Sequence, residues 1–260
     1  TGAGSGLVRF DRTNMTRLTP KDGLLSMDTG GLSVAPDGAV WFGDGPGALT
    51  RYDGTNFTHF TKRDGVPSGP IVAVHATPSG SVWLTTADGP PCRYDGRSFV
   101  HFTEQGRVKA TGFLEIETGP DGATWFATRT GAYRYEEDAL ALFSVAHGLP
   151  EVSVAVSLLR RPKLLSTRDG KLYLGTATNG LVRFDGKKFE AFDDKNSLSG
   201  GYVFDLVQAA DGLLWLTTSN AIVRFDGSRF LPSPTNLHLP VIGAGASLAQ
   251  ARDGAIWVST

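Results

Sequence analysis

The chain has 260 residues, of which 40% are hydrophobic and 20% are charged, and its formal net charge is −1 at pH 7. No run of lysine and arginine is longer than a pair, which excludes the extended basic surface of a nucleic-acid-binding protein. No apolar stretch approaches the roughly 20 residues of a membrane-spanning helix. A single cysteine, Cys92, excludes an internal disulfide.

The chain opens with two segments that have the composition of short strands. They are GLVRFD and MTRL, within residues 5–18. Each is too short for a helix, and together they are rich in residues that favour strands. They supply only half of the unit that recurs in the rest of the chain.

A short sequence anchored by an aromatic residue then recurs six times. Its copies are AVWFG (Trp41), SVWLT (Trp83), ATWFA (Trp125), KLYLG (Tyr173), LLWLT (Trp215) and AIWVS (Trp257). The anchors are 42 residues apart, except that Trp125 and Tyr173 are 48 apart. A fixed period of this length indicates a repeat architecture, and an unbroken repeat predicts a single domain over residues 1–260.

The unit over residues 65–102 shows how one repeat folds. Four segments favour strands, here named A to D in chain order: 71–76, 81–86, 91–95 and 98–102. Turn residues separate them, and Asp-Gly pairs recur between A and B and after C. Asp-Gly favours type I′ hairpins, in which both central residues have positive φ. No segment of ten or more residues has helical periodicity.

A four-stranded meander that recurs about every 42 residues predicts an all-β fold, a six-bladed β-propeller of four-stranded antiparallel blades. Residues 243–260 supply only strands A and B of a blade, and residues 5–18 supply only C and D. We therefore expect N-terminal strands C and D to pair with C-terminal strands A and B and close the ring. An open stack of sheets is the alternative, because an array cut after whole repeats has the same complementary ends.

Packing explains the repeated aromatic and arginine residues. Each aromatic anchor lies between apolar neighbours, so we expect it to fill the wedge between adjacent blades rather than to stack on a ligand. An arginine, followed by an aromatic and an acidic residue, lies near the end of each strand C. We expect it to pair with the aspartate of the A–B turn at the same end of a blade, in its own or the neighbouring sheet. Ser79 replaces that aspartate in one unit.

Together these features resemble the two-component regulator propeller repeat. The shared pattern is DG-x-x-W-[FLV]-x-T, then G-L-x-R-[FY]-D-G, then x-x-F-x-x-F and G-L-P-S. The best copies are DGKLYLGTATNGLVRFDGKKFEAF at 169–192 and DGLLWLTTSNAIVRFDGSRF at 211–230. The resemblance covers the entire chain. A more distant similarity is to streptogramin lyases, which have a related DG-x-x-W-F unit.

The resemblance implies a sensory region of a bacterial two-component-type signalling system, in the periplasm or outside the cell. Such propellers often respond to carbohydrate fragments. In that family the propeller commonly precedes an all-β connector, a membrane helix and kinase domains, and this sequence contains none of these. Six repeats are present where family members often have seven. No signal peptide is visible at Thr1, so the expected location rests on the resemblance.

Propellers bind ligands at the mouth of the central channel, which strand A lines, so residues that break the repeat there are candidates. Ten residues before each anchor stand Gly31, Ala73, Glu115, Lys163, Asp205 and Ser247. Eight residues before each anchor stand Ser33, His75, Glu117, Leu165, Val207 and Ala249. His75, Glu115, Glu117 and Asp205 stand out, because charged groups on an inner strand need water, a partner or a bound cation.

Two further positions depart from the repeat. Asp44 replaces the threonine found three residues after every other anchor, and it is a fifth candidate at the rim of the channel. The unit between Trp125 and Tyr173 is longer than its peers. Its extra length precedes strand A if that strand is KLLST, and follows it if the strand is VSVAV. The sequence leaves both open.

The favoured interpretation is a non-enzymatic module that binds a small molecule or oligosaccharide at the channel mouth. Its candidate ligand-binding residues are His75, Glu115, Glu117, Asp205 and Asp44, and none is assigned a catalytic role. No cofactor is expected; a divalent cation in the channel is the alternative to a purely hydrated site. A lyase-like enzyme that uses His75 with a carboxylate as general base, and a protein-interaction scaffold, are the other hypotheses. A protein partner fits a sensory role.

Overall fold

The computed structural model describes residues 6–10, 14–87, 89–102, 112–128, 131–136, 138–150, 163–176, 180–192, 198, 203–218, 221–231, 247–251 and 253–259. These residues form β-strands and three short 3₁₀ helices, η1 (Pro20–Asp22), η2 (Lys62–Asp64) and η3 (Val145–His147). The chain divides into two compact units, Thr1–Ile116 and Glu117–Thr260. The described residues contain no α-helix, and therefore none with the length and hydropathy of a membrane span.

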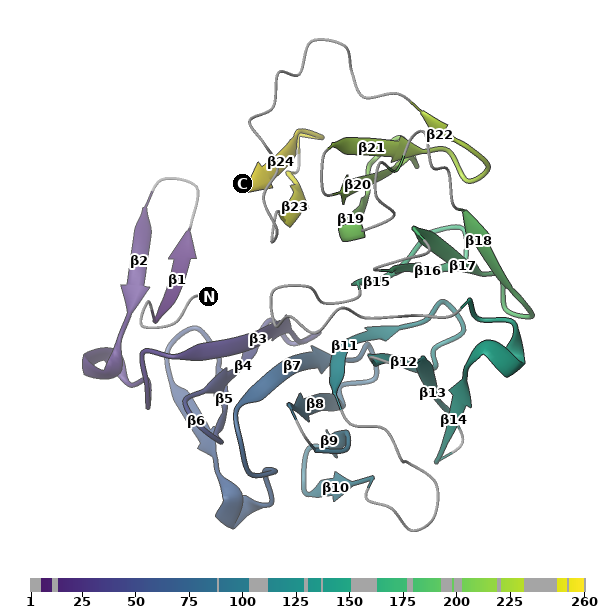
Figure 1. The fold of residues 1–260 in the computed structure, drawn as a ribbon. Coiled ribbons are helices and arrows are strands. Elements are labelled where there is room, and N and C mark those ends of the chain that lie inside the picture. The colour runs from purple at the N-terminus through teal and green to yellow at the C-terminus, as the bar shows by residue number, and fades with distance from the viewer. Residues whose placement is uncertain are drawn as a thin grey trace. The chain divides into compact units, whose positions relative to one another are not determined.

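The first unit contains one two-stranded and two four-stranded antiparallel sheets (Figure 1). The two-stranded sheet pairs β1 (Leu7–Phe10) with β2 (Met15–Leu18). The next sheet is β3 (Thr29–Val34), β4 (Val40–Asp44), β5 (Leu49–Tyr52) and β6 (Phe57–Phe60). It is followed by β7 (Ile71–Ala76), β8 (Val82–Thr86), β9 (Cys92–Tyr94) and β10 (Phe99–His101). Neighbours in each sheet are neighbours in the sequence, which is the predicted meander.

The same meander continues from β11 (Phe113–Thr118), which contains the boundary between the units. With β12 (Thr124–Thr128), β13 (Ala132–Glu136) and β14 (Ala139–Phe143) it forms a third four-stranded sheet. The fourth comprises β15 (Lys163–Ser166), β16 (Leu172–Gly175), β17 (Leu181–Phe184) and β18 (Phe189–Phe192). The fifth comprises β19 (Val203–Gln208), β20 (Leu214–Thr218), β21 (Ile222–Phe225) and β22 (Phe230–Leu231).

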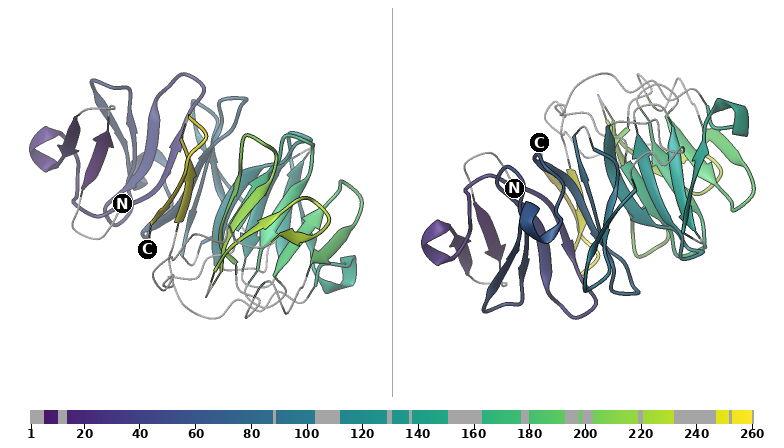
Figure 2. Two further views of the ribbon diagram at one scale, coloured as in Figure 1. Left: turned by 90° about the horizontal axis from the view of Figure 1, so that it is seen from above. Right: turned by 90° about the horizontal axis from the view of Figure 1, so that it is seen from below.

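The last sheet has two strands, β23 (Ser247–Gln250) and β24 (Ile256–Ser259). The predicted all-β architecture of four-stranded antiparallel sheets is therefore confirmed, and both ends of the chain supply half-sheets as expected. Each sheet has the twist that is usual for β-structure (Figure 2).

The strand register confirms the repeat offsets read from the sequence. For five of the anchors, the residue eight positions earlier is the cross-strand partner in strand A: Ser33↔Trp41, His75↔Trp83, Leu165↔Tyr173, Val207↔Trp215 and Ala249↔Trp257. Strand A of the fourth sheet is the KLLS segment, so Leu165 is correctly aligned. The extra length of that unit therefore precedes strand A; residues 151–162 lie outside the described part of the chain.

The aspartate–glycine turns differ from the expected type I′ hairpin. Of the described residues other than glycine, only Asp138 has a positive φ. In the first A–B turn, Gly38 has φ 84° and donates to the Ala35 carbonyl, while the Asp37 carboxylate accepts from the Ala39 amide at 3.0 Å. The side chain of the aspartate thus holds the turn through an Asx bond, which type I′ geometry does not require.

Aromatic anchors fill the spaces between neighbouring sheets within each unit, as predicted. Trp41 packs on Phe60 of its own sheet and on Tyr94 of the next, with ring centroids 5.6 and 5.7 Å apart. Trp125 contacts Phe143 and Phe184 in the same way, at 5.2 and 5.0 Å. The last anchor differs: Trp257 is 69% exposed, whereas Trp125 is 1% exposed.

Candidate functional site

Polar side chains of the innermost strands join neighbouring sheets. In the first unit, the Ser33 hydroxyl on β3 accepts a hydrogen bond from the Ala76 amide on β7 at 2.9 Å. In the second unit, the Asp205 carboxylate on β19 accepts one from the Leu248 amide on β23 at 2.7 Å. Both bonds satisfy a backbone donor that the sheet itself does not pair, so they fix the spacing of adjacent inner strands.

Asp205, a sequence candidate, is buried and used by the protein itself. Its other oxygen accepts from the Leu206 amide at 2.9 Å and lies 3.8 Å from the Lys163 ammonium on β15. A β-bulge between Val203 and Asp205 changes the direction of this part of the strand. The carboxylate thus links β15, β19 and β23. Lys163 and Asp205 occupy the same offset in adjacent units, which is the sequence signal for this pair.

His75 lies half-buried on β7, where its cross-strand partner is Trp83. Burial lowers the pKa of His75 from 6.5 to about 4, because desolvation disfavours the imidazolium. The ring is therefore neutral at physiological pH and presents one hydrogen-bond donor and one acceptor.

Glu115 and Glu117 lie on β11, at alternate positions of the strand. Alternate residues point to the same face of a sheet, so both carboxylates share one face of β11. Both residues are half-buried, while Phe113 and Ile116 of the same strand are buried in apolar surroundings.

Asp44 ends β4, and its buried carboxylate holds a neighbouring loop. It accepts hydrogen bonds from the amides of Leu25 and Ser26, each at 2.9 Å, and from the Thr50 hydroxyl at 3.1 Å. Threonines at the equivalent offset, such as Thr128, bond instead to a carbonyl of their own turn. Asp44, which departs from the repeat, therefore has a structural role: it fixes the loop that leads into β3.

Sequence reasoning missed His59, which completes the surroundings of Asp44. The His59 Nδ1 atom lies 2.9 Å from the Thr50 hydroxyl and 3.9 Å from the Asp44 carboxylate. The residues around His59 follow the repeat, and no sequence spacing identified His59 as a candidate. Only the cross-strand register Thr50↔His59 brings it to Thr50.

The predicted pairing of arginines with turn aspartates is confirmed in two sheets. Arg51 bonds Asp37 and Arg134 bonds Asp121, each at 2.8 Å. Arg93, whose unit carries Ser79 in place of the aspartate, lies over the Trp83 ring at 5.8 Å.

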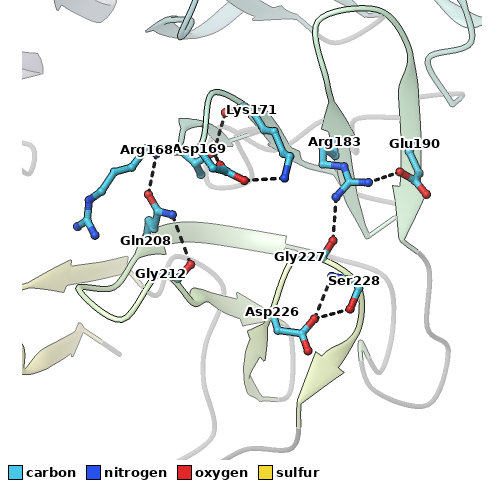
Figure 3. A network of polar contacts seen from close by, with 11 residues as sticks. Arg168, Asp169, Lys171, Arg183, Glu190, Gln208, Gly212, Asp226, Gly227 and Ser228 are labelled. Carbon is cyan, nitrogen blue, oxygen red and sulfur yellow. Dashed lines mark hydrogen bonds and ion pairs between the residues drawn. The ribbon is translucent and has the colours of Figure 1, made fainter.

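The pairing is wrong for Arg183. Figure 3 shows that Arg183 bonds Glu190 and the Gly227 carbonyl of the next sheet, the latter at 2.8 Å. Asp169, its expected partner, pairs with Lys171 at 2.6 Å. The positively charged Lys171 competes for the turn aspartate, and Glu190, directly opposite Arg183 on β18, replaces it.

An apolar hollow of about 440 Å³ lies within the first unit. Leu18, Leu32, Val40 and Tyr52 contribute to its lining, together with residues of β1. Leu32 is 47% exposed, whereas its equivalent in the next sheet, Val74, is 7% exposed. This face of the β3–β6 sheet therefore lacks the cover that the β7–β10 sheet receives from Trp41.

Within the described part of the chain, no three histidine, cysteine, aspartate or glutamate side chains form a group that could hold a metal ion. The candidates instead fall into two kinds. Asp205 and Asp44 are engaged by backbone amides, while His75, Glu115 and Glu117 are half-buried on β7 and β11.

No protein-family model matches the chain, and no curated protein sequence matches it. Solved structures share its fold. A streptogramin B lyase aligns with TM-score 0.73 and 16% identity, over 98% of this chain and 83% of that chain. A catalytically inactive virginiamycin B lyase from Staphylococcus aureus, with quinupristin, aligns with TM-score 0.69 and 17% identity, over 91% of this chain and 79% of that chain.

The extracellular domain of the hybrid two-component system BT3049 from B. thetaiotaomicron aligns with TM-score 0.70 and 19% identity. The alignment covers 94% of this chain and 34% of that one, so this chain spans about a third of that domain. Both kinds of protein named by the sequence resemblance thus appear among the structural neighbours. At these identities the likeness establishes the propeller-type fold.

Proposed function

We propose that this chain is a non-enzymatic sensory module that binds a small polar molecule, with oligosaccharides as the favoured class, at the inner strands of a propeller. The observation that carries the proposal is that His75, Glu115 and Glu117 are polar, half-buried residues on the first strands of their sheets. All three also break the repeat. A neutral imidazole and a carboxylate pair offer donors and acceptors for sugar hydroxyls.

Asp205 and Asp44 play a supporting part in this proposal. Their carboxylates already accept two or more hydrogen bonds from the protein. They fix the inner strands and the loop before β3, and so they pre-organise the surroundings of a ligand. A direct contact of either carboxylate with the ligand stays a prediction.

A ligand site at a channel mouth requires a ring, and we propose that the ring has six blades and is closed by the two half-sheets. Strand β24 would pair with β1 in the register of the complete sheets. There the anchor always faces the arginine of strand C, as in Trp41↔Arg51 and Trp125↔Arg134. Trp257 would accordingly face Arg9.

Two features support this closure. Trp257 is exposed, unlike Trp41 and Trp125, and so lacks the packing of its equivalents. The hollow in the first unit contains Tyr52, which occupies the position at which Tyr94 contacts Trp41. Its volume of about 440 Å³ is ample for an indole ring. Closure would bury both apolar surfaces.

The sensory role and a location in the periplasm or outside the cell belong to the same proposal. They are supported by the likeness to extracellular domains of two-component systems, of which this chain spans about a third. Binding at the inner strands would be passed to an attached protein partner by the rigid sheets around them.

A thermal-shift screen with oligosaccharides and divalent cations tests ligand binding. A ligand present at 100 times its dissociation constant should stabilise the fold by about 2.7 kcal/mol. Glu115→Gln, Glu117→Gln and His75→Gln should each reduce the shift, whereas Glu136→Gln, at the exposed end of β13, should not. No shift with any sugar or cation, or a shift unaffected by all three inner-strand variants, would contradict the proposal.

A lyase-like enzyme is the second candidate, favoured by the shared fold of the streptogramin B lyase. The pKa of His75 near 4 counts against it, because an efficient general base has a pKa near the working pH. We therefore expect no turnover when the chain is incubated with a streptogramin B substrate. Turnover abolished by His75→Ala would replace the binding proposal with the enzymatic one.

A further inference from the structure

Strands β5 and β9 each end in a tyrosine that bonds the turn between strands C and D. The Tyr52 hydroxyl donates to the Gly54 carbonyl at 2.7 Å, and the Tyr94 hydroxyl donates to the Gly96 carbonyl at 3.0 Å. Tyr94 is also the residue that packs on Trp41, the anchor of the preceding sheet. In both four-stranded sheets of the first unit, the turn carbonyl therefore has a donor from its own strand C.

Strands β17 and β21 end in phenylalanine instead, so their turns receive no such hydroxyl. In the fifth sheet another donor takes its place. The Gly227 carbonyl, two residues after Phe225, accepts a hydrogen bond from the Arg183 guanidinium of the preceding sheet at 2.8 Å (Figure 3). An arginine from the neighbouring sheet thus replaces the tyrosine hydroxyl at this turn.

The Gly186 carbonyl, at the equivalent turn of the fourth sheet, receives neither donor. Phe184 has no hydroxyl, and Arg134, which occupies the position of Arg183 in the preceding sheet, bonds Asp121 at 2.8 Å and also Glu136. Among the described residues, none donates a hydrogen bond to the Gly186 carbonyl. A backbone carbonyl is a strong acceptor, so this one is left to solvent or to a ligand.

A pocket of about 270 Å³ lies beside this carbonyl, within the second unit. Part of its lining is apolar and buried: Trp125, Leu172 and Phe184. Exposed turn residues complete the lining: Pro120, Asp121, Gly170 and Gly186. Pockets for drug-sized ligands have about 300–1,000 Å³, so this one suits a single ring rather than an extended oligosaccharide.

The polar groups of the lining are acceptors, so a ligand must donate a hydrogen bond to them. They are the Gly186 carbonyl and the Asp121 carboxylate. The charge of Asp121 is already paired with Arg134. The turn at residues 185–188 has two lysines and one aspartate, which disfavours a cationic ligand. A neutral donor on an apolar ring therefore fits the pocket better than an ammonium group.

We propose that this pocket binds a phenol, a neutral ring whose hydroxyl donates to the Gly186 carbonyl while the ring packs against Phe184. The bond repeats, from outside the chain, the one that Tyr94 makes to its own turn. A free phenolic compound and the tyrosyl side chain of a peptide share this chemistry. No lining residue belongs to the proposed site at the inner strands, so the two proposals can fail separately.

Two probes test the role of the hydroxyl. Phenol can donate a hydrogen bond, whereas anisole keeps the ring and the oxygen but cannot donate. In an NMR titration, phenol should shift the Lys187 amide, which shares a peptide group with the Gly186 carbonyl. It should bind about two- to tenfold more tightly than anisole, the effect of one neutral hydrogen bond. If N-acetyltyrosinamide shifts the same amide, the pocket takes a tyrosyl side chain; if only phenol does, it takes small phenolic compounds.

Phe184→Tyr supplies the missing hydroxyl from within the chain. It should raise the melting temperature and abolish the preference for phenol over anisole, because the new hydroxyl occupies the Gly186 carbonyl. The matched control is Phe225→Tyr, in the sheet where Arg183 already engages the equivalent carbonyl, and it should leave the preference unchanged. Equal affinities of the two probes for the unaltered chain, no shift at Lys187, or an undiminished preference in Phe184→Tyr would overturn the proposal.

Discussion

The Asp205 carboxylate on β19 accepts a hydrogen bond from the Leu248 amide on β23 at 2.7 Å, and so one side chain holds two neighbouring sheets together. Ser33 does the same for the Ala76 amide in the first unit, at 2.9 Å. The innermost strands thus carry bonds between sheets in addition to the apolar packing of the aromatic anchors.

Replacing Asp205 should destabilise the second unit. Asp205→Ala removes the acceptor of both the Leu206 and Leu248 amides in a buried place. An unsatisfied buried donor costs about 1–3 kcal/mol, so we expect a loss in that range from urea denaturation. Asp205→Asn, which keeps one carbonyl oxygen, should lose less. Equal stability of the alanine variant and the unaltered chain would show that the bond contributes nothing.

Replacement of the buried Asp44 should cost more stability than replacement of the exposed Asp37. Asp44→Thr installs the residue of the other repeats but removes the acceptors of the Leu25 and Ser26 amides. We expect a loss of about 3 kcal/mol. The control is Asp37→Ala, which breaks an exposed pair with Arg51 and the solvent-exposed bond from the Ala39 amide, and it should cost about 1 kcal/mol. A smaller loss at Asp44 than at Asp37 would contradict the structural role.

His75 should make stability depend on pH in a defined window. Its pKa is lowered by burial to about 4, below the value of about 6.5 in an unfolded chain. Between these values the unfolded chain binds a proton that the folded chain does not, so the free energy of unfolding falls as pH falls from about 6.5 to about 4. His75→Gln should reduce this fall. Urea denaturation at pH 7 and pH 4.5 measures it; identical pH dependence in both proteins would refute the assignment.

The repeat pattern was sufficient to predict most of the fold. A period of 42 residues, aromatic anchors and turn residues predicted the four-stranded sheets and their strand order. The type of the Asp-Gly turn was not predictable from the dipeptide, because the Asp37 side chain bonds the backbone and changes the turn. The partner of Arg183 was missed because Lys171 competes for Asp169.

The candidate site was predictable only in part. Departure from the repeat identified His75, Glu115, Glu117, Asp205 and Asp44, but it could not distinguish an aspartate that is held by backbone amides, such as Asp44, from one that is not. That distinction depends on single hydrogen bonds, such as the Leu25 amide to Asp44, between residues far apart in the sequence. The role of His59 beside Thr50 follows from strand register and has no sequence signal.

The anchors supply a matched pair of variants. Trp125→Ala removes a side chain that is 1% exposed and should cost about 3–5 kcal/mol. If the half-sheets close the ring, Trp257→Ala should also cost more than about 2 kcal/mol, although Trp257 is 69% exposed in the structure described. Chemical denaturation measures both. A negligible loss of unfolding free energy for Trp257→Ala, beside a large loss for Trp125→Ala, would indicate that Trp257 does not pack between two sheets.

Ring closure, on which the proposed site depends, is tested most directly by a disulfide between β1 and β24. The register of the complete sheets, as in Phe42↔Thr50 and Leu216↔Val223, pairs Val258 with Val8. Cα atoms of such a pair are about 5.5 Å apart, which suits a disulfide. The double variant Val8→Cys, Val258→Cys should form an intramolecular bond on oxidation and melt at a higher temperature, while Val100→Cys, Val258→Cys should not. Free thiols, or only intermolecular bonds, in the first variant would contradict a closed six-bladed ring.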